Sequence, residues 1–104
     1  MMINTLTTLK EVLLNASQLP WDFALYIPIK ERSWLSDMPV MILDPEDTDD
    51  PDEAKKNGLQ YALTVSSVQD VVENAMAQDK SASVELLIQA LIYYYENDAF
   101  IALG

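Results

Sequence analysis

Apolar residues recur at intervals of three and four between residues 5 and 16, which is the spacing of one face of an amphipathic helix. The residues on this face are Leu6, Leu9, Val12, Leu13 and Ala16. Asn4 or Thr5 stands where a side-chain oxygen can accept a hydrogen bond from an N-terminal backbone N–H. Because proline disfavours helical geometry in the residue before it, we expect the helix to end near Leu19 and Pro20.

Three later segments have the patterns of β-strands. From Trp21 to Ile27, large apolar residues alternate with other residues, a period of two that is typical of a strand with one well-buried face, and Pro28 ends it. Met38–Leu43 is rich in branched apolar residues, and Gln60–Val65 reads as a third strand. Between these two, Asp52–Asn57 predicts a helical turn that Gly58 ends with a left-handed cap.

Two further helices are predicted in the C-terminal third of the chain. Ser66 or Ser67 opens the first, and Gln69 completes a capping box with Ser66. Its apolar stripe consists of Val68, Val71, Val72, Ala75 and Met76. Ser83 caps the second helix, which runs from Val84 to about Glu96. The core face of this helix centres on Leu87, Ala90, Leu91 and Tyr94.

One apolar residue of the last helix is out of place in this pattern. A rotation of about 100° per residue puts Ile92 among Glu85, Gln89 and Glu96, on the face that should meet water. Either the segment Ala99–Leu103 folds back over Ile92, or Ile92 meets a partner. We expect the fold-back, because isolated apolar residues on a surface are common.

The order of the elements defines the expected fold class. A helix, three strands and two helices with short connections predict an α+β domain, a small antiparallel sheet of about three strands with helices packed on one face. A chain of 104 residues has the length of one domain, so residues 1–104 are expected to share one core.

Charge and composition narrow the classes of partner. Seventeen acids and six bases give a net charge of −11, which repels nucleic acid and anionic lipid and attracts basic proteins. We therefore expect no direct nucleic-acid or membrane contact. No apolar run reaches the roughly 18 residues that span a bilayer, and the N-terminus has no secretory pattern. Since cysteine is absent as well, a reducing compartment fits, and we expect a cytoplasmic protein.

The acids are concentrated in one segment. Seven of them, with no base, lie between residues 44 and 53, namely Asp44, Glu46, Asp47, Asp49, Asp50, Asp52 and Glu53. Pro45 and Pro51 keep this segment out of the sheet, and repulsion among its carboxylates favours an extended, mobile loop. Such a segment either binds a basic partner or only keeps the protein hydrated.

The sequence contains few residues of the kinds that catalyse reactions or bind metals and cofactors. Histidine and cysteine are both absent, which removes the usual general base and the thiolate nucleophile, so we expect no catalytic residue and no enzyme. A calcium-loop pattern begun at Asp47 fails, because Asp52 stands where glycine is required and Gly58 where an acid is required. The only glycines are Gly58 and Gly104, too few for a phosphate-binding loop. We expect no metal site and no cofactor.

Aromatic residues near the acidic segment complete the candidate surface. Trp21, Trp34 and Tyr61 can anchor an interface or belong to the core, and both roles are common for these side chains. We place Trp34 with the seven acids as the candidate partner-binding residues.

Three stretches carry a resemblance to a known group of proteins. AKKNGLQYALTVSSVQDVVENA, LPWD and YYYENDAF resemble a family of small acidic bacterial proteins with no assigned enzymatic activity. Some members look like immunity proteins of toxin–immunity systems, including contact-dependent growth inhibition. The resemblance implies a cytoplasmic protein that neutralises an incoming basic toxin, often a nuclease, by covering its active or substrate-binding surface.

Two other functions fit the same residues. An acidic mimic of nucleic acid would inhibit a host DNA- or RNA-binding protein, but its carboxylates would spread over a broad surface. A non-enzymatic adaptor module would bind its partner through Ile92 and the aromatic residues of the last helix.

Overall fold

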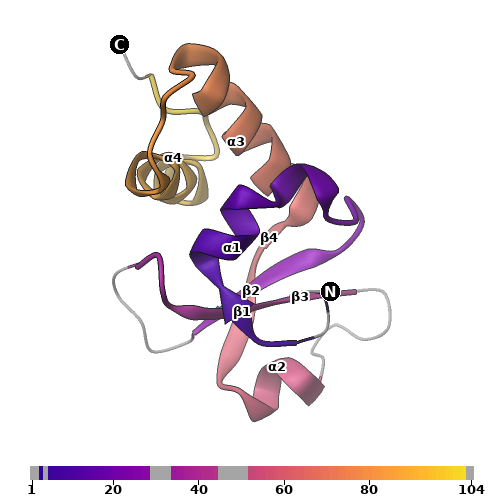
Figure 1. The fold of residues 1–104 in the computed structure, drawn as a ribbon. Helices are drawn as coiled ribbons and strands as arrows, with labels where there is room; N and C mark the ends of the chain where they lie inside the picture. The colour runs from indigo at the N-terminus through magenta and orange to yellow at the C-terminus, as the bar shows by residue number, and fades with distance from the viewer. Residues whose placement is uncertain (1–2, 4, 29–33, 45–51, 103–104) are drawn as a thin grey trace.

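The computed structural model describes residues 3, 5–28, 34–44 and 52–102, with only the backbone of Asp52 and Glu53 (Figure 1). The elements in chain order are β1 (Thr7–Thr8), α1 (Leu9–Leu14), the short 3-10 helix η1 (Ala16–Gln18), β2 (Ala24–Pro28), β3 (Pro39–Leu43), α2 (Asp52–Lys56), β4 (Leu59–Thr64), α3 (Val65–Gln78) and α4 (Val84–Asn97). The α+β class is confirmed. Along the described ranges, every helix is too short or too polar to cross a lipid bilayer.

The strands form one antiparallel sheet in the order β1-β3-β2-β4. Leu25 pairs with Ile42 of β3 on one side and with Leu63 of β4 on the other. The three predicted strands are thus confirmed, and β1 adds a short fourth strand, since Thr7 pairs with Val40. The register between β2 and β4 shifts between Leu25 and Tyr26, so β2 carries an irregularity there.

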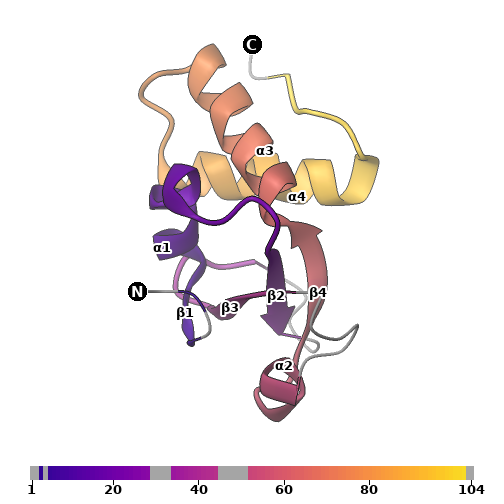
Figure 2. The same ribbon diagram turned by 90° about the vertical axis from the view of Figure 1, so that its right-hand side faces the viewer.

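Both faces of the sheet are covered. Leu25 and Ile27 of β2 belong to the larger core, which includes buried residues of α1, α3 and α4. The alternate residues Ala24 and Tyr26 belong to a smaller core that α2 closes with Ala54. Figure 2 shows α1, α3 and α4 above the strands and α2 below them. The prediction of a single buried face for this strand is therefore wrong, because α2 buries the second face.

The first helix begins later than the periodicity predicts. Thr8, and not Asn4 or Thr5, is its N-cap, and its hydroxyl oxygen accepts a hydrogen bond from Glu11 N at 3.2 Å. Residues Thr7 and Thr8 pair with β3 instead of joining the helix, and Leu6 remains 51% exposed. Strand pairing therefore takes the residues that the helical spacing assigned to the first turn.

The third helix also starts differently. Thr64 caps it through a 3.1 Å hydrogen bond from Ser67 N, so neither Ser66 nor Ser67 is the N-cap. The predicted capping box does not form, because Ser66 lies inside the helix and is not its N-cap. The Gln69 side-chain amide donates to two backbone oxygens elsewhere. These are Ala16 O at 2.8 Å and Leu19 O at 3.0 Å. Gln69 thus joins α3 to η1 and to the residue that follows it.

Fewer residues of the predicted apolar stripe of α3 are buried than expected. Val68, Val71 and Ala75 are buried, Val72 is half-buried against the larger core, and Met76 is 39% exposed. Val65, which the sequence analysis assigned to a strand, is also buried and begins the helix. Its backbone N–H donates to Phe23 O at 2.9 Å, which fixes the start of α3 beside β2.

The last helix matches its prediction closely. Ser83 is the N-cap, with its hydroxyl oxygen 3.2 Å from Leu86 N, and Leu87, Ala90 and Leu91 are buried. Asp98 ends the helix with a left-handed φ of 52°. Gly58, at a φ of 68°, supplies the predicted left-handed turn after α2.

The C-terminal segment folds back, but onto another flank of α4 than expected. The Phe100 ring lies 5.4 Å from the Tyr94 ring, and Gln78 Nε2 donates to Ile101 O at 2.9 Å. Tyr94 and Ile92 lie on different flanks of a helix, because two residues subtend about 200°. Along the described residues, Ile92 faces Trp34 and Leu35 across a groove instead.

Candidate partner-binding surface

The acidic segment is anchored at both ends in the smaller core. Leu43 ends β3 at 4% exposure, Ala54 of α2 is 1% exposed, and both side chains belong to that core. Asp44 follows Leu43 and is half-buried. Glu46, Asp47, Asp49 and Asp50 lie outside the described residues, and so does the prediction of an extended, mobile loop. The anchors bring the start and end of the segment to one side of the sheet.

The N-terminal turn of α2 also belongs to this segment. Asp52 and Glu53 begin the helix, whereas Lys55 and Lys56 lie in its last turn. This order of charges agrees with the helix dipole, which favours acids at the N-terminus and bases at the C-terminus. In the chain, the last two acids of the segment therefore precede the two bases of α2, which is the order that stabilises a helix.

Trp34 lies away from these anchors. It precedes β3, whereas Asp44 follows β3, and a strand of this length spans about 17 Å at roughly 3.4 Å per residue. The predicted set of partner-binding residues is therefore divided between the two ends of β3. The strand predicted over Met38–Leu43 already separates Trp34 from Asp44 in the chain, and β3 confirms that strand.

Trp34 is held at the edge of the larger core. Its side chain is half-buried, and its ring centroid is 5.1 Å from that of Tyr95 in α4, with an interplanar angle of 54°. The segment that follows Trp34 is fixed to α1, since Lys10 N donates to Ser36 O at 2.9 Å and Leu9 N to Met38 O at 3.2 Å. These contacts give the segment a defined position beside α4.

A groove of about 430 Å³ lies between this segment and α4, and we call it the Trp34 groove. It is lined by Trp34, Leu35, Ser36, Asp37, Glu85, Ile88, Gln89 and Ile92. The α4 residues follow the i, i+3, i+4, i+7 pattern of one helix face. The helical pattern predicted Ile92 on this face of α4. No sequence pattern indicated Leu35 and Asp37, because they belong to no helical or strand periodicity.

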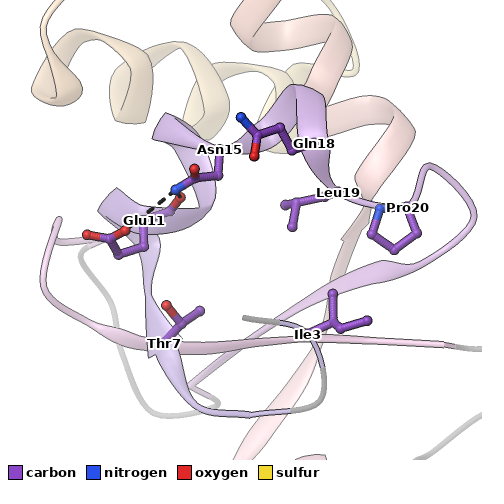
Figure 3. Close-up of a pocket in the computed structure, with 7 residues that line it drawn as sticks. All are labelled: Ile3, Thr7, Glu11, Asn15, Gln18, Leu19 and Pro20. Atoms are coloured by element: carbon purple, nitrogen blue, oxygen red, sulfur yellow. Dashed lines mark hydrogen bonds between the residues drawn. The ribbon is translucent and has the colours of Figure 1, made fainter. Parts of the chain in front are cut away.

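A second cavity of about 370 Å³ lies beside α1 (Figure 3). It is lined by Ile3, Thr7, Glu11, Asn15, Gln18, Leu19 and Pro20. The Asn15 side-chain amide donates to Glu11 O at 2.9 Å, and it lies 3.5 Å from the Glu11 carboxylate. Among the described lining residues Glu11 is the only titratable one, so these residues contain no acid–base pair.

A third cavity, of about 390 Å³, lies beside α3 and is lined by Ala16, Ser17, Gln69, Val72 and Glu73. Glu73 is the only titratable residue among the described lining residues, and the Gln69 amide is already bonded to Ala16 O and Leu19 O. No group of three or more acids within the described ranges is placed to hold a metal ion.

The other two aromatic candidates lie outside the Trp34 groove. Trp21 precedes β2 and is 70% exposed. Tyr61 of β4 is 48% exposed and meets the Tyr26 ring edge to face, with centroids 5.9 Å apart. Neither residue lines the groove, so the structure does not gather the three aromatic residues into one patch.

Fold and surface together define a small acidic α+β domain with a shallow groove between a loop and its last helix. Residues 6–103 match the family model described as "Domain of unknown function (DUF7716)", and the chain belongs to this family. No curated protein and no solved structure matches the chain.

Proposed function

We propose that this protein is a non-enzymatic, cytoplasmic inhibitor that binds and neutralises a basic protein toxin, as immunity proteins do in toxin–immunity systems. The observation that carries the proposal is the concentration of acids in one segment of the chain. Seven carboxylates without a base stand between two buried anchors, Leu43 and Ala54, which belong to the same small core. The described residues that flank the segment, Leu43 and Ala54, thus lie together in the smaller core on one side of the sheet.

The charge suits the inhibition of a nuclease. A nuclease binds phosphate with Lys and Arg side chains, and carboxylates can occupy the same side chains. Complementary charge also steers the two proteins together and raises association rates by about 10 to 10³-fold. An inhibitor that competes with abundant nucleic acid gains from such fast association. We infer that the acidic segment covers the substrate-binding surface of the toxin.

An adaptor module is the second candidate, and the position of Ile92 favours it. Ile92 is half-buried beside the exposed Leu35 and has no covering segment within the described residues. An adaptor would bind through this side of the domain without inhibiting any enzyme. The nucleic-acid mimic has less support, because seven of the seventeen acids lie within ten residues instead of being spread over the surface.

The test uses the product of the gene next to this one. Under the proposal, that gene encodes a basic toxin, the two proteins co-purify, and the complex has lost the toxin's activity on its substrate. An adaptor would bind its neighbour without loss of activity. An isolated gene, or a neighbouring toxin that remains fully active with excess of this protein, contradicts the proposal.

A matched pair of variants tests the role of the acidic segment. Neutralising Asp47, Asp49 and Asp50 removes three charges from the segment, and neutralising Asp22, Asp70 and Glu73 removes three exposed charges elsewhere. Both variants have the same net charge, so only a specific role of the segment makes the first one the weaker inhibitor.

A further inference from the structure

The floor of the Trp34 groove is apolar and accessible. Ile88 is 5% exposed at its base, while Ile92 and Trp34 are half-buried and still reach the groove surface. Leu35 on the opposite wall is 54% exposed. A side chain that enters between these walls would remove apolar surface from water on both sides, which is the main favourable term in most protein association.

The rim of the groove is acidic. Asp37 lies on the loop side and Glu85 on the helix side, and both side chains are exposed. No Lys or Arg is among the described residues of the lining. A ligand with a cationic group on each side of an apolar anchor is therefore complementary to the groove in both charge and polarity.

The shape of the groove favours a protein segment over a small molecule. Small-molecule sites enclose most of the ligand and direct a few buried polar groups at it. In the Trp34 groove the charged and amide groups, Asp37, Glu85 and Gln89, are all exposed. The lining of α4 extends from Glu85 to Ile92, about 10 Å at 1.5 Å per residue, which is the length of two helical turns.

We propose that the Trp34 groove is a docking site for a short basic segment of a partner protein. The segment places Leu, Ile or Phe against Ile88 and Ile92, and Lys or Arg beside Asp37 and Glu85. The inference rests on the proposed function and deepens it by naming a second contact point. The acidic segment lies beyond the other end of β3 and accelerates association, while the groove slows dissociation, since apolar contacts act chiefly on the dissociation rate.

Trp34 itself reports on occupancy. The chain has two tryptophans, and Trp21 is 70% exposed, so Trp21→Phe leaves Trp34 as the only indole without disturbing a buried contact. Covering the half-buried Trp34 ring shifts its fluorescence emission to shorter wavelength. The probe is an amphipathic peptide made only of Leu and Lys. A peptide of Leu and Glu and an oligolysine are its controls.

We expect the Leu–Lys peptide to shift the emission at about 0.15 M salt, where distant charges are screened. The Leu–Glu peptide and oligolysine leave the emission unchanged. Leu35→Ser weakens binding about tenfold, because the anchor loses an apolar wall. Leu14→Ser, at a residue that is 56% exposed on α1, is the matched control and binds like the parent.

The acidic rim has its own pair of variants. D37N combined with E85Q weakens binding about threefold, as expected for exposed charge pairs. D22N combined with D70N changes the net charge equally at two exposed sites outside the groove and has no effect.

Several outcomes overturn the inference. They are an unchanged Trp34 emission with the Leu–Lys peptide, an equal shift with oligolysine, and equal binding by Leu35→Ser and Leu14→Ser. An emission shift that appears on raising the protein concentration alone would assign the groove to a second copy of the chain, which also overturns it.

Toxin inhibition by the same variants separates this inference from the proposed function. If Leu35→Ser inhibits the toxin as well as the parent does, the proposed function stands and the groove is not part of the interface. If the groove binds the Leu–Lys peptide but the protein inhibits no toxin, the proposed function fails and the groove remains a docking site.

Discussion

The indole of Trp34 packs against the ring of Tyr95, with centroids 5.1 Å apart and the planes inclined at 54°. This contact joins the segment before β3 to the C-terminal half of α4. Trp34 also packs against the larger core, whereas Tyr95 is 44% exposed. One aromatic pair therefore connects the core to the surface that we assign to a partner.

A double-mutant cycle measures this pair. Trp34→Ala and Tyr95→Ala should each destabilise the fold, and their coupling free energy should be about 0.5–1.5 kcal/mol, as for other aromatic pairs. Urea denaturation of the four proteins gives the value. Trp34→Ala paired with Tyr61→Ala is the control cycle, because Tyr61 meets Tyr26 instead. Additive effects of the Trp34 and Tyr95 substitutions would mean that the rings do not interact in solution.

Three buried leucines of α1 and α4 should carry much of the stability. Leu13, Leu87 and Leu91 are at most 4% exposed and belong to the larger core, as the sequence predicted. Alanine at any of them should lower the free energy of unfolding by about 2–5 kcal/mol. Val72→Ala should cost less, because Val72 is only half-buried. Leu14→Ala, on the exposed side of α1, serves as the neutral reference, and equal losses at Leu14 and Leu13 would reverse the assigned orientation of this helix.

Gln69 should contribute more than a surface glutamine does. Its amide donates to Ala16 O and Leu19 O, which belong to the first residue of η1 and to the residue just after it. Gln69→Ala leaves both acceptors without this donor, so we expect a loss of about 1–3 kcal/mol in the free energy of unfolding. Gln60→Ala, at an exposed position of β4, is the comparison. Hydrogen exchange should show faster opening around η1. A loss of stability no larger than that of Gln60→Ala would mean that these hydrogen bonds do not stabilise the fold.

Gly58 should resist substitution for a backbone reason alone. Its φ is +68°, and a Cβ built at this position meets nothing within 4 Å. Gly58→Ala should therefore cost about 1–2 kcal/mol, since L-residues other than Asn and Asp rarely adopt this conformation. Gly58→Asn should cost less. Thermal unfolding distinguishes the two variants, and equal melting temperatures would point to a different conformation at this turn.

Neutralising the acidic segment should change kinetics more than stability. Replacing its seven acids by Asn or Gln should slow association with a basic partner and weaken the dependence of that rate on salt. The fold should be retained or become more stable, because the change removes repulsion among crowded like charges. Stopped-flow association at several salt concentrations tests this. Unchanged rates at low salt would leave the segment with no part in binding and direct attention to the Trp34 groove.

Much of the helical structure follows from signals within a few residues of each other. Ser83 with the stripe of α4, and Gly58 after α2, were identified from sequence because caps and 3.6-residue periodicity act within about four residues. The excess of acids between residues 44 and 53 is likewise independent of the fold. The sequence thus determined the helices, the three main strands and the sign of the charge that a partner would meet.

Other features depended on pairing between distant segments. Thr7 joins a strand because Val40 is beside it, and β2 is buried on both faces because α2 packs against its second side. Gln69 bonds to η1 instead of completing a capping box, since the fold brings the oxygens of Ala16 and Leu19 within reach. None of these partners is visible in local periodicity.

The candidate surface also combines features that the sequence predicts with features that only the tertiary structure determines. The sequence singled out the seven acids and Trp34, and β3 separates Trp34 from Asp44, the first of these acids. The groove beside Trp34 exists because Leu35 and Asp37 come to lie opposite Glu85 and Ile92, far along the chain. Local sequence determines which groups a segment carries. Tertiary packing decides which groups meet, because burial of apolar surface rewards contacts at any separation along the chain.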